Sequence, residues 1–114
     1  MKRKLSQEDI LDCIDRLKYA KEYIKEGRRY ICCQLYNYPY GTEELSSYLA
    51  NWIQSMLGDH TSIEAYLSTY IYHKEHKLYL IDELINTPSL RTKVKNTRIK
   101  WLNYMIRELK KELK

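Results

Sequence analysis

The sequence predicts an all-α fold: a single compact bundle of four to five helices, forming one domain over residues 1–114, with a long basic C-terminal helix. Apolar residues recur at i, i+3 and i+4 along most of the chain, which is the pattern of amphipathic helices. Only three Gly and two Pro occur, too few for the turns of β-hairpins or for phosphate-binding loops. The composition, 44% hydrophobic and 31% charged, is that of an ordinary globular protein.

A first helix is predicted from the capping residue Ser6 to Gly27. Its opposite side, which we expect to be exposed, carries Asp12, Arg16, Tyr19 and Tyr23. The stretch 28–35 is too short to classify by periodicity, and we favour a helix over a buried extended segment. A turn follows at 37–41, where proline fixes one backbone angle and glycine permits a positive φ.

A second helix is predicted from Thr42 to Gly58, and a third begins at the capping sequence 61–64. The apolar pattern lapses between His73 and Lys77, so the stretch 73–84 either prolongs the third helix or forms a separate short one. A last helix opens at Thr87-Pro88 and runs to the end of the chain.

Charge is distributed unevenly along the chain. The net charge is +3 over residues 1–40, −5 over 41–88 and +7 over 89–114, which together give the overall +5. On the last helix one outward face is cationic, with Lys93, Lys100, Arg107, Lys111 and Lys114. This face is either a solvated surface favoured by the helix dipole or a surface that binds anions.

Three further cations of the last helix fall within its apolar arc: Arg91, Lys95 and Arg98. A guanidinium at that position must be paired, reach outward or hold an anion, because an unpaired buried charge costs several kcal/mol. The sequence leaves open whether Arg98 binds a ligand or bridges to Glu43, Glu44, Glu64, Asp82 or Glu83.

A second basic and aromatic cluster combines guanidinium groups with flat rings that can stack on nucleotide bases. It comprises Arg28, Arg29 and Tyr30, followed by Tyr36, Tyr38 and Tyr40. The predicted ligand-binding residues are therefore Arg28, Arg29, Tyr30, Arg91, Lys93, Lys95, Arg98 and Lys100. The same composition suits a protein interface, for which we expect Tyr19, Tyr23, Tyr36 and Tyr38.

We expect no enzymatic activity, no metal site and no cofactor, because the known catalytic and phosphate-loop motifs are missing. His73 and His76 have metal-ligand spacing, but surface histidines among lysines explain them better. Cys32 and Cys33, beside Arg28, are interpreted as small buried hydrophobes rather than as reactive thiolates.

A cytoplasmic location without membrane attachment is expected. No apolar run approaches the roughly 20 residues that cross a bilayer, and the basic N-terminus is not followed by an apolar signal segment. Three cysteines, two of them adjacent, fit a reducing compartment better than a disulfide framework.

Several short aromatic and apolar blocks resemble those of small uncharacterised helical accessory proteins of tailed bacteriophages and prophages. The blocks are Tyr30-Ile31-Cys32, Trp52-Ile53 to Leu57-Gly58, Ser62 to Tyr66-Leu67, and Arg98 to Trp101-Leu102 and Met105-Ile106. They span about two thirds of the chain, although Tyr66 stands where those proteins have tryptophan and the stretch 73–89 has no counterpart. The resemblance implies a phage product that acts in the bacterial cytoplasm and blocks or diverts a host function without catalysis.

Three functional hypotheses follow. The first is a homo-oligomeric binding protein that captures an anionic host ligand such as a signalling nucleotide, because cations cluster beside rings. The second is binding of nucleic acid by the last helix. The third is a protein-protein inhibitor or adaptor that docks on a host protein through tyrosine-rich faces. The homo-oligomer is expected because the many half-polar rings suggest more apolar surface than a small monomer leaves in water.

Overall fold

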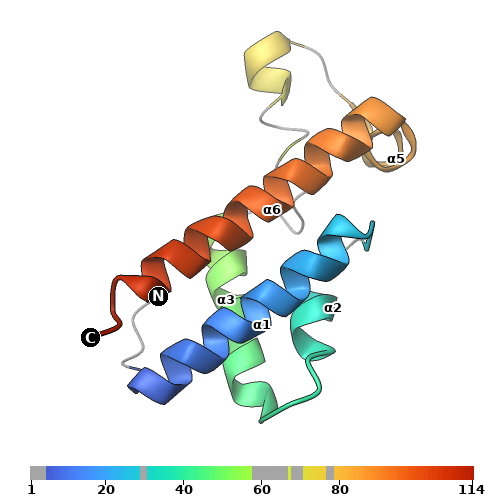
Figure 1. Cartoon of the computed structure of the whole chain (residues 1–114). Coiled ribbons are helices and arrows are strands. Elements are labelled where there is room, and N and C mark those ends of the chain that lie inside the picture. Colours follow the sequence, from blue (N-terminus) through green and yellow to red (C-terminus); the bar gives the residue numbers. More distant parts are fainter. Residues whose placement is uncertain (1–4, 29–30, 58–66, 68–70, 77–78) are drawn as a thin grey trace.

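The computed structural model describes residues 5–28, 31–57, 67, 71–76 and 79–114. All regular secondary structure in these ranges is helical, which confirms the all-α prediction. The helices with complete bounds are α1 (Gln7–Lys25), α2 (Ile31–Tyr36), α3 (Glu43–Leu57), α5 (Ile81–Asn86) and α6 (Pro88–Lys110). Residues 71–75 add a further helical segment (Figure 1).

Helix α1 begins and ends where the sequence predicts. The Ser6 hydroxyl accepts a hydrogen bond from the backbone N–H of Asp9 at 3.1 Å, which satisfies one of the free donors of the first turn. At the other end Gly27 adopts φ +104°, a conformation that L side chains rarely adopt, and it turns the chain away from the helix axis.

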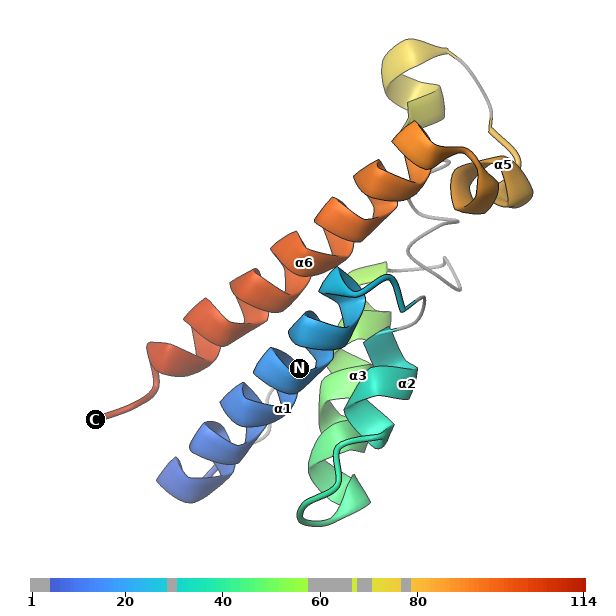
Figure 2. The same cartoon turned by 45° about the vertical axis from the view of Figure 1, so that its right-hand side comes forward.

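The two longest helices, α1 and α6, lie side by side and antiparallel (Figures 1 and 2). The Gln7 side chain joins the start of α1 to the end of the chain: its amide donates to the Glu112 carbonyl at 3.1 Å, and its oxygen accepts from the Lys114 N–H at 2.9 Å. Helices α2 and α3 also pack against α1, and their buried apolar side chains join one hydrophobic core. Helix α5 and the segment 71–75 lie near the N-terminal end of α6 (Figure 2).

The structure resolves two questions that periodicity left open. Residues 31–36 of the short stretch are helical, as favoured, and form α2. The stretch 73–84 is broken: the helical segment ends at His76, whose φ is +54°, and α5 starts at residue 81. This break explains why six helices can be followed in the described part of the chain, where four to five were predicted.

One expectation about α1 is wrong. Arg16 was placed on the exposed side of the helix, but its side chain is buried and only 1% exposed. The predicted third helix start at 61–64 and the expected helix end at Gly58 lie outside the described residues. Among the residues that are described, no helix is long and apolar enough to span a bilayer.

Candidate functional site

One cavity of about 470 Å³ brings together cations from distant parts of the sequence. It lies between the end of α1, helix α5 and the first half of α6, and we call it the basic cavity. Four of the predicted ligand-binding side chains line it: Arg28, Arg91, Lys95 and Arg98. Lys25 is a fifth cation on the wall, and Glu26 is the one carboxylate among the described residues that line it.

Helical spacing on α6 and the turn at Gly27 position the cations around the basic cavity. Arg91, Lys95 and Arg98 follow each other at i, i+4 and i+7, so they share one face of α6. The turn at Gly27 brings Arg28 to the opposite wall of the cavity. The apolar part of the lining comes from Ile24, Leu84 and Val94, all of which belong to the hydrophobic core.

The cations of the basic cavity differ in how far carboxylates neutralise them. Lys25 is paired with Glu22, with 3.6 Å between the ammonium nitrogen and the carboxylate oxygen. Within the described ranges, Arg91 and Lys95 form no ion pair. Arg28 rests near the ring of Tyr23, with 5.7 Å between the guanidinium carbon and the ring centre. Arg98 is 6% exposed and already takes part in an interaction within the chain, so it contributes charge to the wall rather than a free guanidinium.

This arrangement can attract and hold an anion. Guanidinium and ammonium groups are the usual ligands of phosphate and carboxylate, and a partly enclosed site strengthens their attraction. No aromatic ring appears among the described residues that line the cavity. The described lining residues offer a ligand charge and hydrogen-bond donors.

The remaining predicted ligand-binding residues are not part of the basic cavity. Lys93 and Lys100 are exposed on the opposite face of α6 and line a different recess. Arg29 and Tyr30 lie outside the described residues. The sequence already placed Lys93 and Lys100 on the outward face and the other α6 cations within the apolar arc, but it could not indicate which neighbour each face meets.

Three of the four predicted interface tyrosines come together. The ring centres of Tyr19 and Tyr23 lie 4.8 Å apart, those of Tyr19 and Tyr38 5.3 Å, and those of Tyr38 and Tyr40 5.5 Å. Tyr36 has a different contact, since its hydroxyl is 2.8 Å from the Ser47 hydroxyl. Burial, followed by the carboxylates of Asp12 and Asp15, raises the pKa of Tyr38.

Beneath this tyrosine cluster lies a buried polar network that the sequence did not predict. The Arg16 guanidinium donates to Asp12 Oδ1 at 3.1 Å, to the Ser46 hydroxyl at 2.7 Å and to the Tyr40 carbonyl at 2.9 Å. Ser46 in turn donates to the Leu35 carbonyl at 2.8 Å. The one available signal, Asp12 four residues before Arg16, is common on exposed helices and does not distinguish a buried pair.

The cysteines differ in their surroundings. Burial, and then the neighbouring Cys33, raises the pKa of the Cys32 thiol, which disfavours the thiolate. Cys33 is exposed, so its interpretation as a buried hydrophobe is wrong. His73 and His76 are both exposed, and no group of three metal-binding side chains occurs among the residues available for that search.

Comparison of the chain with protein-family models, curated proteins and solved structures yields no significant match.

Proposed function

We propose that the protein is a non-catalytic binding protein that captures an anionic small molecule, such as a signalling nucleotide, in the basic cavity. We place it among phage accessory products of the bacterial cytoplasm, where removal of such a ligand would counteract a host function. In this proposal the long basic helix α6 of a single helical bundle supplies most of the binding groups.

The observation that supports the proposal is the meeting of Arg28 with Arg91, Lys95 and Arg98 around one cavity. Arg28 lies about 60 to 70 residues before the other three in sequence, and only folding brings it to them. Gathering like charges costs free energy unless an anion or carboxylate compensates it. Arg98 already takes part in an interaction within the chain, but Arg28, Arg91 and Lys95 form no ion pair in the described ranges, so a ligand is a natural source of compensation for these three.

The direct test is calorimetric titration of the purified protein with cyclic and linear nucleotides, together with thermal unfolding in their presence. A ligand that binds only the folded state raises the unfolding temperature. Failure of every nucleotide to produce heat or a thermal shift would reject a nucleotide as the ligand.

A matched pair of variants assigns any binding to this cavity. Arg91→Gln and Lys95→Gln each remove one positive charge from the wall, and each is expected to weaken binding by about 10-fold or more, the loss of one charge-assisted hydrogen bond. Lys93→Gln removes the same charge from the opposite face of the same helix and should leave affinity unchanged. Equal effects of all three would indicate general electrostatic attraction rather than a site.

The two cavity variants should also leave the ligand-free protein as stable as before, or slightly more stable, because they relieve repulsion between like charges. A marked loss of stability would instead mean that these cations are structural. Urea unfolding without ligand separates the two interpretations.

A specific observation also favours a protein partner, with self-association as the form we propose. The tyrosine cluster is held by ring contacts, while Tyr36 is 44% and Tyr40 68% exposed beside it. Rigid, partly exposed rings are typical anchors of protein interfaces. Light scattering on the wild type and on Tyr40→Ala tests this: a dimer or larger assembly that dissociates in the variant supports it, and a monomer at high concentration rejects it.

A further inference from the structure

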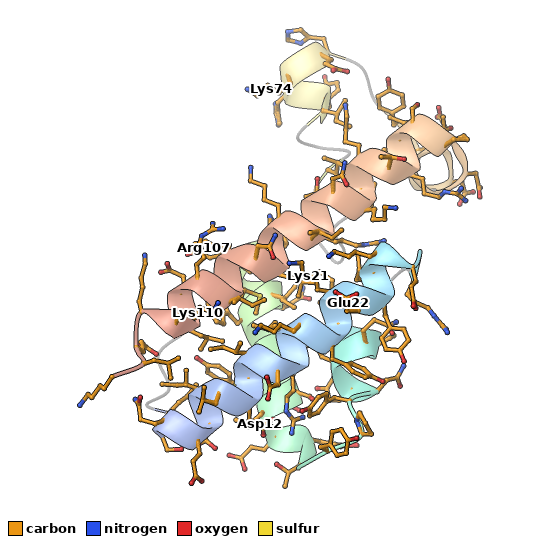
Figure 3. The ribbon with its side chains drawn as sticks, in the orientation of Figure 1. Asp12, Lys21, Glu22, Lys74, Arg107 and Lys110 are labelled. Atoms are coloured by element: carbon orange, nitrogen blue, oxygen red, sulfur yellow. The ribbon has the colours of Figure 1, made fainter. Side chains whose placement is uncertain are left out.

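The face of α6 opposite the basic cavity carries a second, separate set of cations. Lys93, Lys100 and Arg107 recur every seven residues, so they lie roughly 10 Å apart along one side of the helix. At about 100° per residue this side is nearly opposite to that of Arg91 and Arg98. All three cations are exposed, and Figure 3 shows Arg107 projecting from α6 on the side away from α1.

Aromatic rings accompany these cations in a recess of about 370 Å³ between α6 and the end of α3. This aromatic recess is lined by Met56, Lys100, Trp101, Tyr104 and Arg107. Tyr104 is 40% exposed and Trp101 is half-buried against the core, so ring surface is accessible between two cations. A second recess, also of about 370 Å³, shares Lys100 and continues along the helix to Lys93.

The polar groups of this face differ in whether they already have a partner within the chain. The hydroxyls of Thr92 and Thr97 donate to carbonyls of their own helix, at 3.0 Å and 2.9 Å. In contrast, Lys93, Lys100 and Arg107 form no ion pair with any carboxylate in the described ranges. The nearby Glu108 is paired with Lys111 at 2.7 Å. The three cations therefore remain free to contact phosphates.

We propose that this face of α6 binds single-stranded nucleic acid, with phosphates on Lys93, Lys100 and Arg107 and an unstacked base against Tyr104 and Trp101. Cations that follow a line and rings that lie between them are the two components of sequence-independent single-strand binding. The cations extend over about 21 Å of helix, which exceeds a single nucleotide and suits several consecutive ones.

The same features argue against the other polyanions that a basic helix can meet. Duplex DNA keeps its bases stacked, so the rings of the aromatic recess would gain nothing from it. A helix that lies on a membrane needs a broad apolar face. Tyr104 is the one large hydrophobic residue that is strongly exposed on the described length of α6, which is too little for lipid insertion.

The test is fluorescence anisotropy of the full chain with a labelled 20-nucleotide single strand, the corresponding duplex and anionic lipid vesicles. We expect the single strand to bind more tightly than the duplex. Three phosphate contacts predict that the logarithm of affinity falls with that of salt with a slope of about −2, or about 20-fold between 50 and 200 mM. Binding to the duplex or to vesicles as tight as to the single strand would overturn the proposal.

Variants separate the contribution of rings from that of charge. Tyr104→Ala is expected to weaken binding about 10-fold with an unchanged salt slope, whereas Tyr104→Phe, which keeps the ring, should bind like the wild type. Lys100→Gln should reduce the slope by about 0.7, the share of one phosphate. Circular dichroism verifies that each variant is folded, and an unchanged affinity in Tyr104→Ala rejects the stacking role.

The two sites of α6 can be distinguished in the same experiment. Lys95→Gln changes the basic cavity on the other side of the helix and should leave single-strand affinity unchanged. If Lys95→Gln abolishes binding while Lys100→Gln does not, the nucleic acid occupies the basic cavity and the outer face is only a solvated surface. Nucleotide binding in the basic cavity is measured separately and does not depend on this result.

Discussion

Arg16 joins α1 to α3 and to the turn that precedes α3 through buried hydrogen bonds. It belongs to α1, and its guanidinium reaches the Tyr40 carbonyl in the turn and the Ser46 hydroxyl on α3. Its guanidinium also lies 4.8 Å from the centre of the Tyr38 ring. Asp12 provides the countercharge and remains partly exposed. A buried charge satisfied on every side fixes the relative positions of the elements that surround it.

Replacement of Arg16 by methionine, which keeps the length of the side chain, should lower the free energy of unfolding by about 2–4 kcal/mol. The variant leaves the Tyr40 carbonyl and Asp12 without their buried donor. Lys18→Met on the exposed side of the same helix is the control and should change stability by less than about 0.5 kcal/mol. Urea unfolding followed by circular dichroism measures both, and equal stabilities would contradict the structural role of Arg16.

Gly41 is constrained by the same guanidinium. Its φ is +76°, and a Cβ there would lie 2.5 Å from an Arg16 side-chain nitrogen. Gly27 also has a positive φ, but a Cβ there meets nothing within 4 Å. Both Gly41→Ala and Gly27→Ala are expected to destabilise the fold by about 1 kcal/mol or more through backbone strain. The steric conflict adds to this cost at Gly41 alone.

A double-mutant cycle isolates that additional cost. In an Arg16→Met background, Gly41→Ala should cost about 1 kcal/mol less than in the wild type, because the conflicting nitrogen is gone. Gly27→Ala should cost the same in both backgrounds. If Gly41→Ala costs the same in both backgrounds, the side chain of Arg16 moves away from the new methyl group without a loss of stability.

At the scale of the element, α6 presents two different sets of cations on opposite faces. Its buried residues, which include Val94, Leu102 and Met105, pack against α1 and α5, and this packing fixes how the helix is rotated about its axis. Because the rotation is fixed, Arg91 and Lys95 border the basic cavity while Lys93 and Lys100 face the other way. The helical periodicity thus places neighbouring cations on two opposite surfaces within seven residues.

The break after the helical segment 71–75 depends on an unusual residue. His76 adopts φ +54° and its N–H donates to the Tyr72 carbonyl at 2.8 Å, which is how glycine commonly ends a helix. His76→Gly should therefore raise the free energy of unfolding by about 0.5 kcal/mol. His73→Gly, inside the helical segment, should lower it by about 1 kcal/mol. Chemical denaturation gives both values, and a loss of the same size at both positions would refute this assignment.

At the scale of the whole molecule, the described acidic residues of the central part do not line the basic cavity. The net charge of residues 41–88 is −5, yet Glu26, which comes from α1, is the one acid among the described residues that line that cavity. The aromatic recess has no carboxylate in its described lining. Folding therefore keeps two positive surfaces exposed on a chain whose overall charge is only +5.

The stability of the whole molecule should fall at alkaline pH. The fold raises the pKa of the Cys32 thiol above 9.0 and those of Tyr19 and Tyr38 above 10.0, chiefly through burial for Cys32 and Tyr38 and through Tyr23 for Tyr19. Because each group is neutral when protonated, its contribution is complete below its unfolded pKa. It is lost as the pH rises through the folded value.

Urea unfolding between pH 8 and 10.5 checks this dependence. Stability should begin to decline near pH 9, and Cys32→Ala should remove that first part of the decline. Tyr38→Phe should reduce the part above pH 10. A flat profile in the wild type, or the same decline in both variants, would contradict the assigned groups.

Much of the secondary structure could be predicted because its determinants are local. Ser6, Gly27 and Pro88 mark the ends of α1 and the start of α6, and the apolar spacing identifies the faces that are buried. The burial of Arg98 followed from the same wheel that placed it inside the apolar arc. Periodicity did not predict the break in the stretch 73–84. His76 ends the helix in the left-handed backbone conformation, and no glycine or proline marks that position in the sequence.

The sequence by itself determined that the chain is helical and where the main apolar faces of α1 and α6 lie, since both depend on neighbours three or four residues away. Only the tertiary structure decided that Arg28 meets Arg91 and that Arg16 is buried. The physical reason is that the hydrogen-bond partners that allow burial of a polar side chain come from other elements. Arg16 donates hydrogen bonds to Ser46 and Tyr40, which are 30 and 24 residues away in sequence. Over such a separation the spacing of residues carries no geometric information.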